Sequence, residues 1–159
     1  MRELLMSIRP EYSSRIFAGE KRFELRRMRV RVNRGDIVWV YESAPTMALV
    51  GAFAVGSVFF EHLDVIWKRH RASLGVTERE YAAYFDNCEF GCAIEVTAFR
   101  QFDAISLSIL RKRVDGFRPP QSYLWCGPDL ARVLPRQAVQ GLAGATLRAL
   151  GHDVRIFSR

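Results

Sequence analysis

The spacing of apolar residues changes twice within the first 27 positions, and each change marks an expected element. Residues 4–9 are a short, mostly apolar run, which predicts a strand. Pro10 then suits the first position of a helix over residues 11–18, because a proline there loses no helical hydrogen bond. Gly19 follows as a helix-ending glycine. The chain is therefore expected to begin with a strand and a short helix.

In residues 21–27 the apolar positions recur at every second residue, and this period predicts a strand over residues 22–27. Such a strand buries Phe23 and Leu25 on one face. The charged side chains expected away from the core are Lys21, Arg22, Glu24 and Arg26. The alternation therefore predicts a charged strand face just after the first helix.

Further strands are expected at residues 37–41, 49–60 and 91–102. Gly51 and Gly56 fall inside the second of these strands and indicate a bend, as in a sheet that curls. Helices are expected at residues 61–70, 77–85, 106–113 and 135–150, and a last short strand at residues 154–157. This order predicts an α+β fold, a small mixed β-barrel with inserted and C-terminal helices.

The bulk composition limits what kind of protein this is. A chain of 159 residues with 49% hydrophobic residues can form one compact domain with a real core. It has no apolar run long enough to span a membrane and no signal-peptide pattern at its start, so we expect a cytoplasmic protein without a membrane partner. Cys88, Cys92 and Cys126 lack the spacing of a metal knuckle or a disulfide framework and are expected to be buried apolar residues. We therefore expect neither a metal nor a cofactor.

Positive charge is concentrated at the start of the chain. The net charge is +7, and residues 1–34 contain ten basic and four acidic side chains, a local excess of +6. A concentrated basic patch indicates a polyanion or a phosphate-bearing ligand, because it focuses potential where scattered charges do not. The alternative is that the charge serves only solubility.

Two groups of residues in this region can carry chemistry. Lys21 beside Glu24 can act as a phosphate clamp or as a tuned acid/base pair. The alternative is a surface ion pair that contributes roughly 0 to 1 kcal/mol. Arg9, Arg26 and Arg27 are candidates for bidentate contacts with phosphate, which the planar guanidinium makes better than an ammonium.

Aromatic and polar side chains elsewhere could complete a binding surface. Tyr41, Tyr123 and Trp125 are candidate base-stacking surfaces, although Trp125 could equally be a core residue. Ser43, Ser122 and Gln121 lie next to turn prolines and offer hydroxyl or amide groups that can read a base edge or hold a backbone carbonyl.

Several short motifs, in this order, resemble those of the ASCH domain family, a branch of the PUA-like superfamily of β-barrels. They are Ser7-Ile8-Arg9-Pro10-Glu11-Tyr12, residues 16–26, Tyr41-Glu42-Ser43-Ala44-Pro45, Val50-Gly51-Ala52-Phe53 and Pro119-Pro120-Gln121-Ser122-Tyr123. The resemblance covers residue 4 to about residue 125. It therefore predicts an ASCH, PUA-like barrel domain over residues 1–125 and a C-terminal helical extension, residues 126–159, packed on the same domain.

The resemblance implies a cleft lined by the Gly-x-Lys segment and an association with RNA or modified nucleosides. One branch of the family cleaves single-stranded RNA, and another removes an acetyl group from N-acetylated cytidine with a lysine, a threonine and a glutamate. The family lysine falls on Lys21 and the following arginine on Arg26. Glu24 replaces the threonine of the deacylating branch, and no glutamate stands near Ser73, where that branch has its second one.

Two functions follow as hypotheses. The first is a domain that binds RNA or a modified nucleoside in a basic cleft formed by residues 7–27 and 119–125. The alternative is a hydrolase, a single-stranded ribonuclease or an amidohydrolase of N-acylated nucleosides, with Lys21 and Glu24 as catalytic residues. A third possibility is protein contact through the helix expected at residues 135–150. The binding candidates are Ser7, Arg9, Lys21, Arg26, Arg27, Tyr41, Ser43, Gln121, Ser122 and Tyr123.

Overall fold

A computed structural model describes residues 1–142 and residue 144, and its centre is one six-stranded mixed sheet. The strands are β1 (Glu3–Ile8), β2 (Phe23–Arg26), β3 (Ile37–Glu42), β4 (Ala48–His62), β5 (Phe90–Ser106) and β6 (Tyr123–Trp125). Their order across the sheet is β2-β5-β4-β3-β1-β6. Only β1 and β3 run parallel, and the other neighbours are antiparallel.

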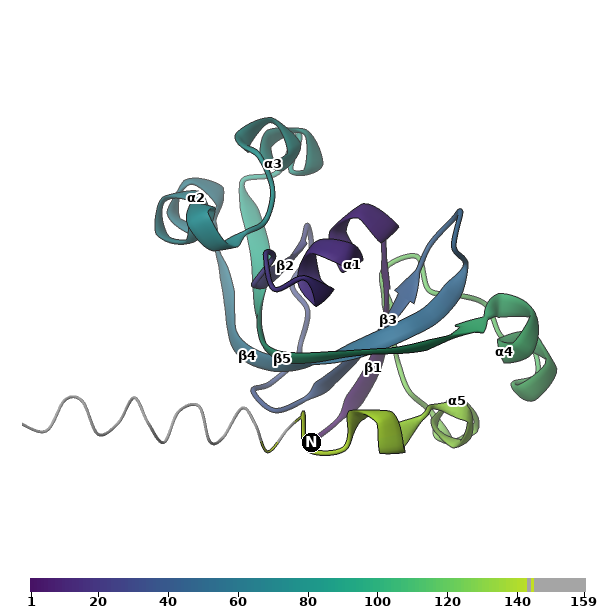
Figure 1. The fold of residues 1–159 in the computed structure, drawn as a ribbon. Coiled ribbons are helices and arrows are strands. Elements are labelled where there is room, and N and C mark those ends of the chain that lie inside the picture. Colours follow the sequence, from purple (N-terminus) through teal and green to yellow (C-terminus); the bar gives the residue numbers. More distant parts are fainter. Residues whose placement is uncertain (143, 145–159) are drawn as a thin grey trace, which may run out of the picture.

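The sheet is strongly bent but does not close into a barrel, so the expected closed barrel is corrected to an open sheet. Its two edges, β2 and β6, do not pair with one another in the described part of the chain. The bend in β4 and β5 is clear in Figure 1. It coincides with register shifts between Leu49 and Gly51 and between Ala54 and Val58. The predicted bend at Gly51 and Gly56 is therefore confirmed, as is the α+β class.

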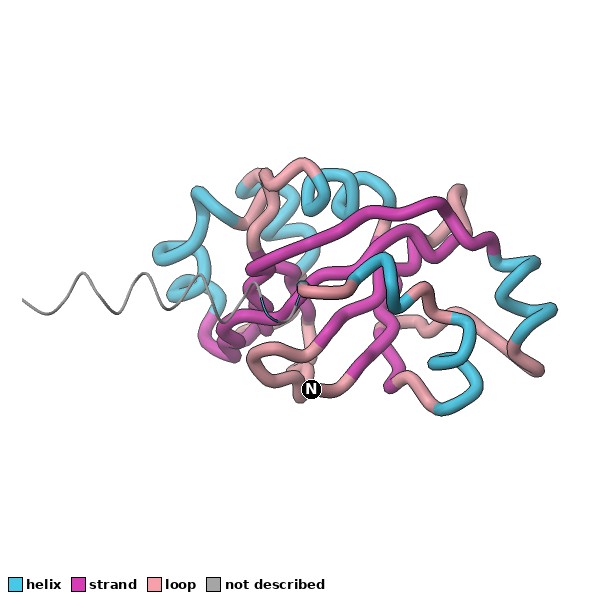
Figure 2. The backbone as a smooth tube through the Cα atoms, turned by 60° about the horizontal axis from the view of Figure 1, so that its bottom comes forward, coloured by secondary structure: helices cyan, strands magenta, loops and turns pink. Residues whose placement is uncertain are grey.

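Short helices cover the sheet on both faces (Figures 1 and 2). They are α1 (Pro10–Phe17), α2 (Leu63–His70), α3 (Glu78–Tyr84), α4 (Leu107–Arg113) and α5 (Pro128–Val133), with 3₁₀ turns at Arg71–Ser73 and Arg136–Val139. The first of these helices lies inside the bend, α2 and α3 cover one end, α4 lies at the opposite end, directly after β5, and α5 lies against the outer face. The helix pair α2 and α3 is the insertion expected from residues 61–85.

Three hydrophobic clusters hold these layers together. Inside the bend, α1 packs through Ile16 against β-strand residues such as Phe53 and Val96. On the outer face, Trp39 packs with the segment after residue 126 through Leu130 and Leu134. Phe23 and Leu25 pack under α2 and α3 in the third cluster, as the alternation predicted.

The C-terminal region differs from the expectation in its described part. In residues 135–141, where a long amphipathic helix was expected to begin, the chain forms a 3₁₀ turn at Arg136–Val139, and Gly141 has a φ of +89°. The rest of that helix, except residues 142 and 144, and the strand expected at residues 154–157 lie outside the described residues. The helix α5 was not predicted, and the division of the chain at residue 125 stays a prediction.

Two simpler expectations concern membranes and cysteines. No helix in the described part of the chain is long and apolar enough to cross a membrane. All three cysteines are free thiols; Cys92 is buried, whereas Cys88 and Cys126 are half-buried. Burial raises the pKa of the Cys126 thiol to about 12. The prediction of buried, apolar cysteines is thus confirmed fully only for Cys92.

Candidate functional site

A cleft of about 650 Å³ opens between α1, the edge strand β2 and helix α3. Eight predicted site residues line it: Ser7, Arg9, Lys21, Glu24, Arg26, Arg27, Ser43 and Gln121. They come from segments that are up to 114 positions apart, between Ser7 and Gln121. The volume falls in the range of about 300 to 1,000 Å³ that is usual for small-molecule sites. The structure therefore brings most of the predicted site together in one place.

Lys21 reaches the cleft floor because the chain turns sharply after α1. Gly19 has a φ of +77°, and the backbone amides of Glu20 and Lys21 both donate to the Arg15 carbonyl. This turn points Lys21 inward, where only 3% of it is exposed. Its Nζ donates to the Phe23 carbonyl at 2.5 Å and to the Leu74 carbonyl at 3.3 Å. Lys21 is therefore a buried floor residue and not a solvated side chain.

Glu24 lies between two cations on this floor. One carboxylate oxygen is 3.7 Å from Lys21 Nζ, and the other is 3.0 Å from the Arg26 guanidinium. The Glu24 side chain is 7% exposed and that of Arg26 10% exposed. The interpretation of Lys21 and Glu24 as a surface ion pair is therefore wrong, because both partners are buried.

Burial sets the protonation chemistry of the floor. Desolvation lowers the pKa of Lys21 below its ordinary value of 10.5, although the Glu24 carboxylate acts in the opposite direction. A lysine with a lowered pKa releases its proton more readily than a solvated one. The Lys21 ammonium is thus a stronger acid than usual, and it stands beside a carboxylate that can accept a proton.

Arg26 links the edge strand β2 to β1, the strand next to the other edge of the sheet. It belongs to the edge strand β2, and its guanidinium donates to the Ser7 carbonyl of β1 at 2.8 Å. Its Nε is buried and has no hydrogen-bond partner within the described residues. A buried donor without a partner is energetically costly, and such groups are uncommon in folded proteins.

Tyrosines form part of the cleft walls. Tyr84 of α3 donates its hydroxyl to the Leu25 carbonyl at 3.1 Å, and the residue is 37% exposed. Tyr12 of α1 is half-buried, and Lys21 Nζ lies 5.9 Å from the centroid of its ring. Burial raises the pKa of both phenols, so both remain neutral at physiological pH. These are flat aromatic surfaces of the kind on which bases stack.

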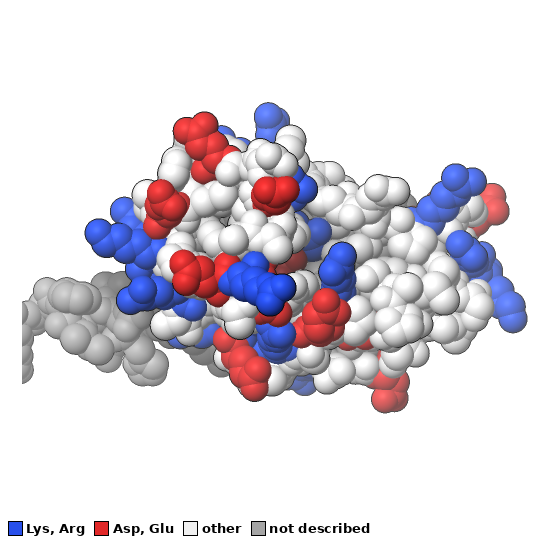
Figure 3. Space-filling model, turned by 90° about the horizontal axis from the view of Figure 1, so that it is seen from above, with Lys and Arg blue, Asp and Glu red and all other residues white. Residues whose placement is uncertain are grey.

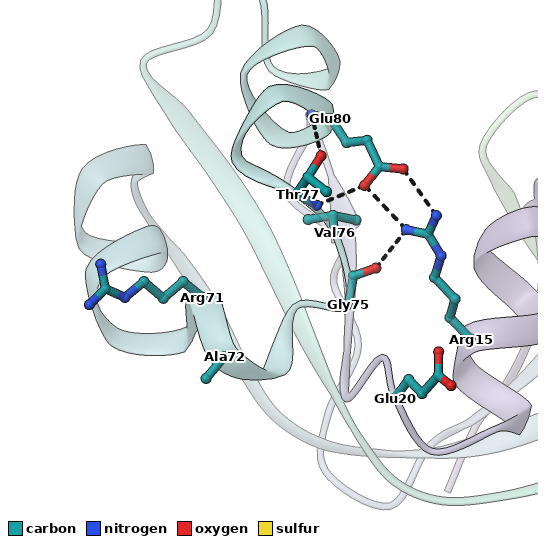
Figure 4. Close-up of a pocket in the computed structure, with 8 residues that line it drawn as sticks. All are labelled: Arg15, Glu20, Arg71, Ala72, Gly75, Val76, Thr77 and Glu80. Atoms are coloured by element: carbon teal, nitrogen blue, oxygen red, sulfur yellow. Dashed lines mark hydrogen bonds and ion pairs between the residues drawn. The ribbon is translucent and has the colours of Figure 1, made fainter.

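A clamp between α1 and α3 forms one side of the cleft (Figure 4). The Arg15 guanidinium donates to both oxygens of Glu80, at 3.1 and 3.2 Å, and to the Gly75 carbonyl at 2.8 Å. This bidentate contact, with the amide of Thr77, lowers the pKa of Glu80 to about 2. A second, open pocket of about 410 Å³ lies beyond the clamp and shares Val76 and Glu80 with the cleft.

Gly75 lets the loop before α3 close over Lys21. Its φ is +63°, and a Cβ at this position would stand 2.5 Å from the Lys21 Cβ. Only glycine combines that backbone conformation with so close an approach. The loop therefore contributes both the cover over Lys21 and the Leu74 carbonyl that accepts from it.

The charge is less concentrated in space than in the sequence. Several arginines of the first 34 residues pair with acids: Arg2 with Asp36, Arg9 with Glu11, Arg15 with Glu80 and Arg26 with Glu24. Figure 3 shows acidic and basic side chains intermixed on the upper face. The cleft itself keeps an excess, with four basic residues (Arg9, Lys21, Arg26, Arg27) and two acidic ones (Glu24, Glu80) in its lining.

Three predicted residues lie outside the cleft lining. Tyr41 is 2% exposed and packs in the outer-face cluster, so it is not available for stacking. Ser122 uses its carbonyl to accept from the Ser7 amide. Tyr123 is half-buried against the inner cluster, and its ring meets that of Trp125 edge-on. The motif around residues 119–123 therefore supports β1, and only Gln121 of it reaches the cleft.

Sequence reasoning missed the part of the cleft that α3 and the loop before it supply. Val76 of that loop and Glu80, Tyr81, Ala83 and Tyr84 of α3 line it. The capping box from Thr77 to Glu80 predicted the helix correctly, and both of its hydrogen bonds are present. Nothing in the local pattern indicated that this helix faces the strand with Glu24. Tyr12 was missed although it belongs to the first motif.

Comparisons with known proteins agree on the fold. The sequence model of the ASCH domain matches residues 6–101. A curated relative, the ASCH domain-containing ribonuclease of Zymomonas mobilis, is 25% identical over 124 residues, covering 78% of this chain and 84% of that protein. The crystal structure of ASCH from Zymomonas mobilis has a TM-score of 0.78 at 24% identity, covering 82% of this chain and 92% of that one. A Pseudomonas putida protein has a TM-score of 0.51 at 14% identity, covering 82% of this chain and 95% of that one.

Proposed function

Since this chain belongs to the ASCH domain family, we propose that its cleft binds single-stranded RNA. The observation that carries the proposal is the buried trio of Lys21, Glu24 and Arg26 on the floor of an open cleft. Three buried charges are expensive to keep, and such groups cluster at functional sites. The name of the Zymomonas mobilis relative, a ribonuclease, favours RNA over other phosphate-bearing ligands.

The cleft offers a strand both kinds of contact that it needs. The excess of basic side chains attracts phosphates, and the exposed guanidinium of Arg9 can donate to a phosphate in the cleft. Tyr12 and Tyr84 offer flat surfaces for a base, and stacking of this kind tolerates every base. Gln121 adds an amide at the cleft edge that can donate to or accept from a base.

A second candidate function, cleavage of the bound strand, is favoured by the Lys21 ammonium beside the Glu24 carboxylate. The 2′-hydroxyl oxygen attacks the adjacent phosphorus while its proton passes to Glu24. The bond from phosphorus to the 5′ oxygen of the next nucleotide breaks, and Lys21 supplies the proton for that oxygen. The products are a 2′,3′-cyclic phosphate and a 5′-hydroxyl, and no water is consumed. Transfer of one proton from Glu24 to Lys21, 3.7 Å apart, restores the site.

Binding and cleavage are tested together with a labelled single-stranded RNA and the Lys21→Met and Glu24→Gln variants. Both variants keep the side-chain size but remove the charge. Lys112→Met on α4 is the matched control, because it removes the same charge from an exposed helix. Chelator is present throughout, and a strand with 2′-O-methyl groups serves as an uncleavable ligand.

Salt-dependent retention is the expected result for binding. The logarithm of the affinity should fall with log salt by about 0.7 per phosphate contact, which gives a clear loss between roughly 50 and 200 mM. Flat affinity over this range contradicts RNA binding. Cleavage should fall at least about 100-fold in Lys21→Met and Glu24→Gln but not in Lys112→Met. Products that persist in Lys21→Met, or that form from the 2′-O-methyl strand, contradict the cleavage mechanism.

A further inference from the structure

A strand of RNA longer than the cleft must continue over the protein surface, and one exposed surface beside the cleft has the chemistry to receive it. The cleft volume of about 650 Å³ is that of a small-molecule site. We infer that the strand leaves past Arg27 and runs over a second contact made by Arg29, Phe60 and Phe90. This surface is called the Phe60–Phe90 platform below. The inference rests on the proposed RNA binding.

Two phenylalanines are exposed together at this place. Phe60, near the end of β4, is 37% exposed, and Phe90, at the start of β5, is 44% exposed. Their rings stack with centroids 6.0 Å apart and planes 21° apart. Figure 1 shows this part of β4 and β5 where the two ribbons rise toward α2 and α3. Exposed aromatic rings that are already held in position are suited to stacking on bases, since little side-chain freedom is lost on binding.

A run of arginines connects the cleft with the platform. The segment from Arg26 to Arg34 contains five arginines and no acidic residue. Arg27 lines the cleft and is held by the Asp86 carbonyl at 2.7 Å. Val30 and Val32 are buried, so the segment is fixed to the core while Arg29 and Arg31 remain exposed. The Arg29 guanidinium carbon lies 5.2 Å from the centroid of the Phe60 ring.

The platform lies close enough to the cleft for one strand to contact both. Arg26 and Phe60 are both register partners of Cys92, on opposite sides of β5. Two strand spacings place their Cα atoms about 10 Å apart. Directly paired residues point to the same face of a sheet, so Arg26, Cys92 and Phe60 form one row. The platform therefore continues the face on which the cleft floor lies.

The observations favour a nucleic acid over a second copy of the chain as the occupant. From the size of a phenylalanine side chain, the two rings expose on the order of 150 Å². A stable protein interface buries about 800 Å² from each partner. Among the described residues, no acidic side chain pairs with Arg29 or Arg31. An arginine without an acidic partner, Arg29, beside two exposed rings matches the alternating phosphates and bases of a strand.

The test compares a short and a long strand. Fluorescence anisotropy measures binding of 2′-O-methyl oligouridylates, a trinucleotide and a strand of about 12 nucleotides, to the wild type, Phe60→Ala/Phe90→Ala and Arg29→Gln. The matched controls are Phe99→Ala, an exposed phenylalanine of β5 (39%) with different neighbours, and Arg113→Gln on α4. Arg29→Gln removes no ring and keeps the inference testable if the double variant does not fold.

We expect the long strand to bind the double variant about tenfold more weakly, as stacking of one base requires, with the trinucleotide unchanged. Arg29→Gln should weaken the binding of the long strand only. It should also reduce the slope of log affinity against log salt for that strand by about 0.7. If the long strand binds the wild type, the double variant and Arg29→Gln with equal affinity, the inference about the platform is overturned and the proposed RNA binding is not. If the wild type binds neither strand, both the inference and the proposed function are overturned. A change from dimer to monomer in the double variant, with RNA affinity unchanged, assigns the platform to a second copy and also overturns the inference.

Discussion

Removal of the Glu24 charge is expected to destabilise the protein strongly, because this carboxylate compensates two buried cations. The Glu24 oxygens lie 3.7 Å from Lys21 Nζ and 3.0 Å from the Arg26 guanidinium. At an effective dielectric constant of about 20, each attraction amounts to roughly 4 to 6 kcal/mol. Desolvation of the three ions offsets much of this gain.

Glu24→Gln keeps the shape of the side chain and leaves Lys21 and Arg26 without a counter-charge. Loss of one partner of a buried ion pair typically costs about 3 to 5 kcal/mol. For a chain of 159 residues this corresponds to a fall of roughly 10 °C in the melting temperature. A second change, Lys21→Met in the Glu24→Gln background, removes one of the uncompensated ions and should restore part of the loss.

Urea unfolding, followed by circular dichroism at pH 7, measures the free energy of unfolding of each variant. Glu61→Gln is the control, because it breaks the more exposed pair with Arg69 and should change the free energy by less than about 1 kcal/mol. A Glu24→Gln variant within 1 kcal/mol of the wild type refutes the reasoning, since the floor charges would then be hydrated and independent. A double variant less stable than Glu24→Gln alone refutes the role given to Lys21.

Three further predictions concern pH and the loop over Lys21. Folding lowers the pKa of Lys21, so on raising the pH the folded state loses this proton before the unfolded state does. The free energy of unfolding of the wild type, compared with that of Lys21→Met, should therefore rise with pH from the lowered pKa up to 10.5. A constant or falling difference contradicts the burial of a charged lysine. The pKa of Glu80 is lowered to about 2. In acid-unfolding curves the wild type should therefore be more stable than Glu80→Gln by its full margin above pH 4.5, and this margin should disappear as the pH falls through about 2. A stability margin that persists at pH 2 contradicts the clamp with Arg15. Gly75→Ala should lower the free energy of unfolding in urea by about 2 to 4 kcal/mol, through left-handed backbone strain plus the clash with Lys21. Gly35 has a φ of +83° but open space around it, so Gly35→Ala should lower the free energy of unfolding by the strain alone. Equal losses of stability in the two variants argue against the close contact.

The elements that depend on local pattern could be predicted from the sequence. Pro10 and Gly19 bound the first helix as expected, and Gly19 adopts the positive φ of a helix-ending glycine. The capping box at Thr77 starts α3, and the glycines in β4 coincide with its register shifts. Each of these features is set by contacts within a few residues, which is why the chain sequence alone carries the signal.

The burial of the floor charges could not be predicted in the same way. Period-two alternation correctly placed Phe23 and Leu25 on one face of β2, but it predicted that Glu24 and Arg26 are solvated. Both are buried, because α1, β1 and the loop before α3 cover the second face of the strand. These covering segments are distant in sequence, and periodicity reports only which residues share a face. The same limit explains Tyr41, which was expected to offer a base-stacking surface but packs in the core.

The open sheet explains why charged groups occupy the floor at all. In a closed barrel the edge strand β2 would use its backbone to pair with the opposite edge, and the polar groups there would be satisfied by the ladder. Here the Arg26 guanidinium bonds the Ser7 carbonyl across the gap, so a side chain replaces the missing backbone contact. A cation in that gap needs a nearby anion, which Glu24 supplies, and Glu24 in turn lies beside Lys21. The gap that keeps the sheet open is thus the cleft, and the residues that bridge it are the charged residues that line its floor.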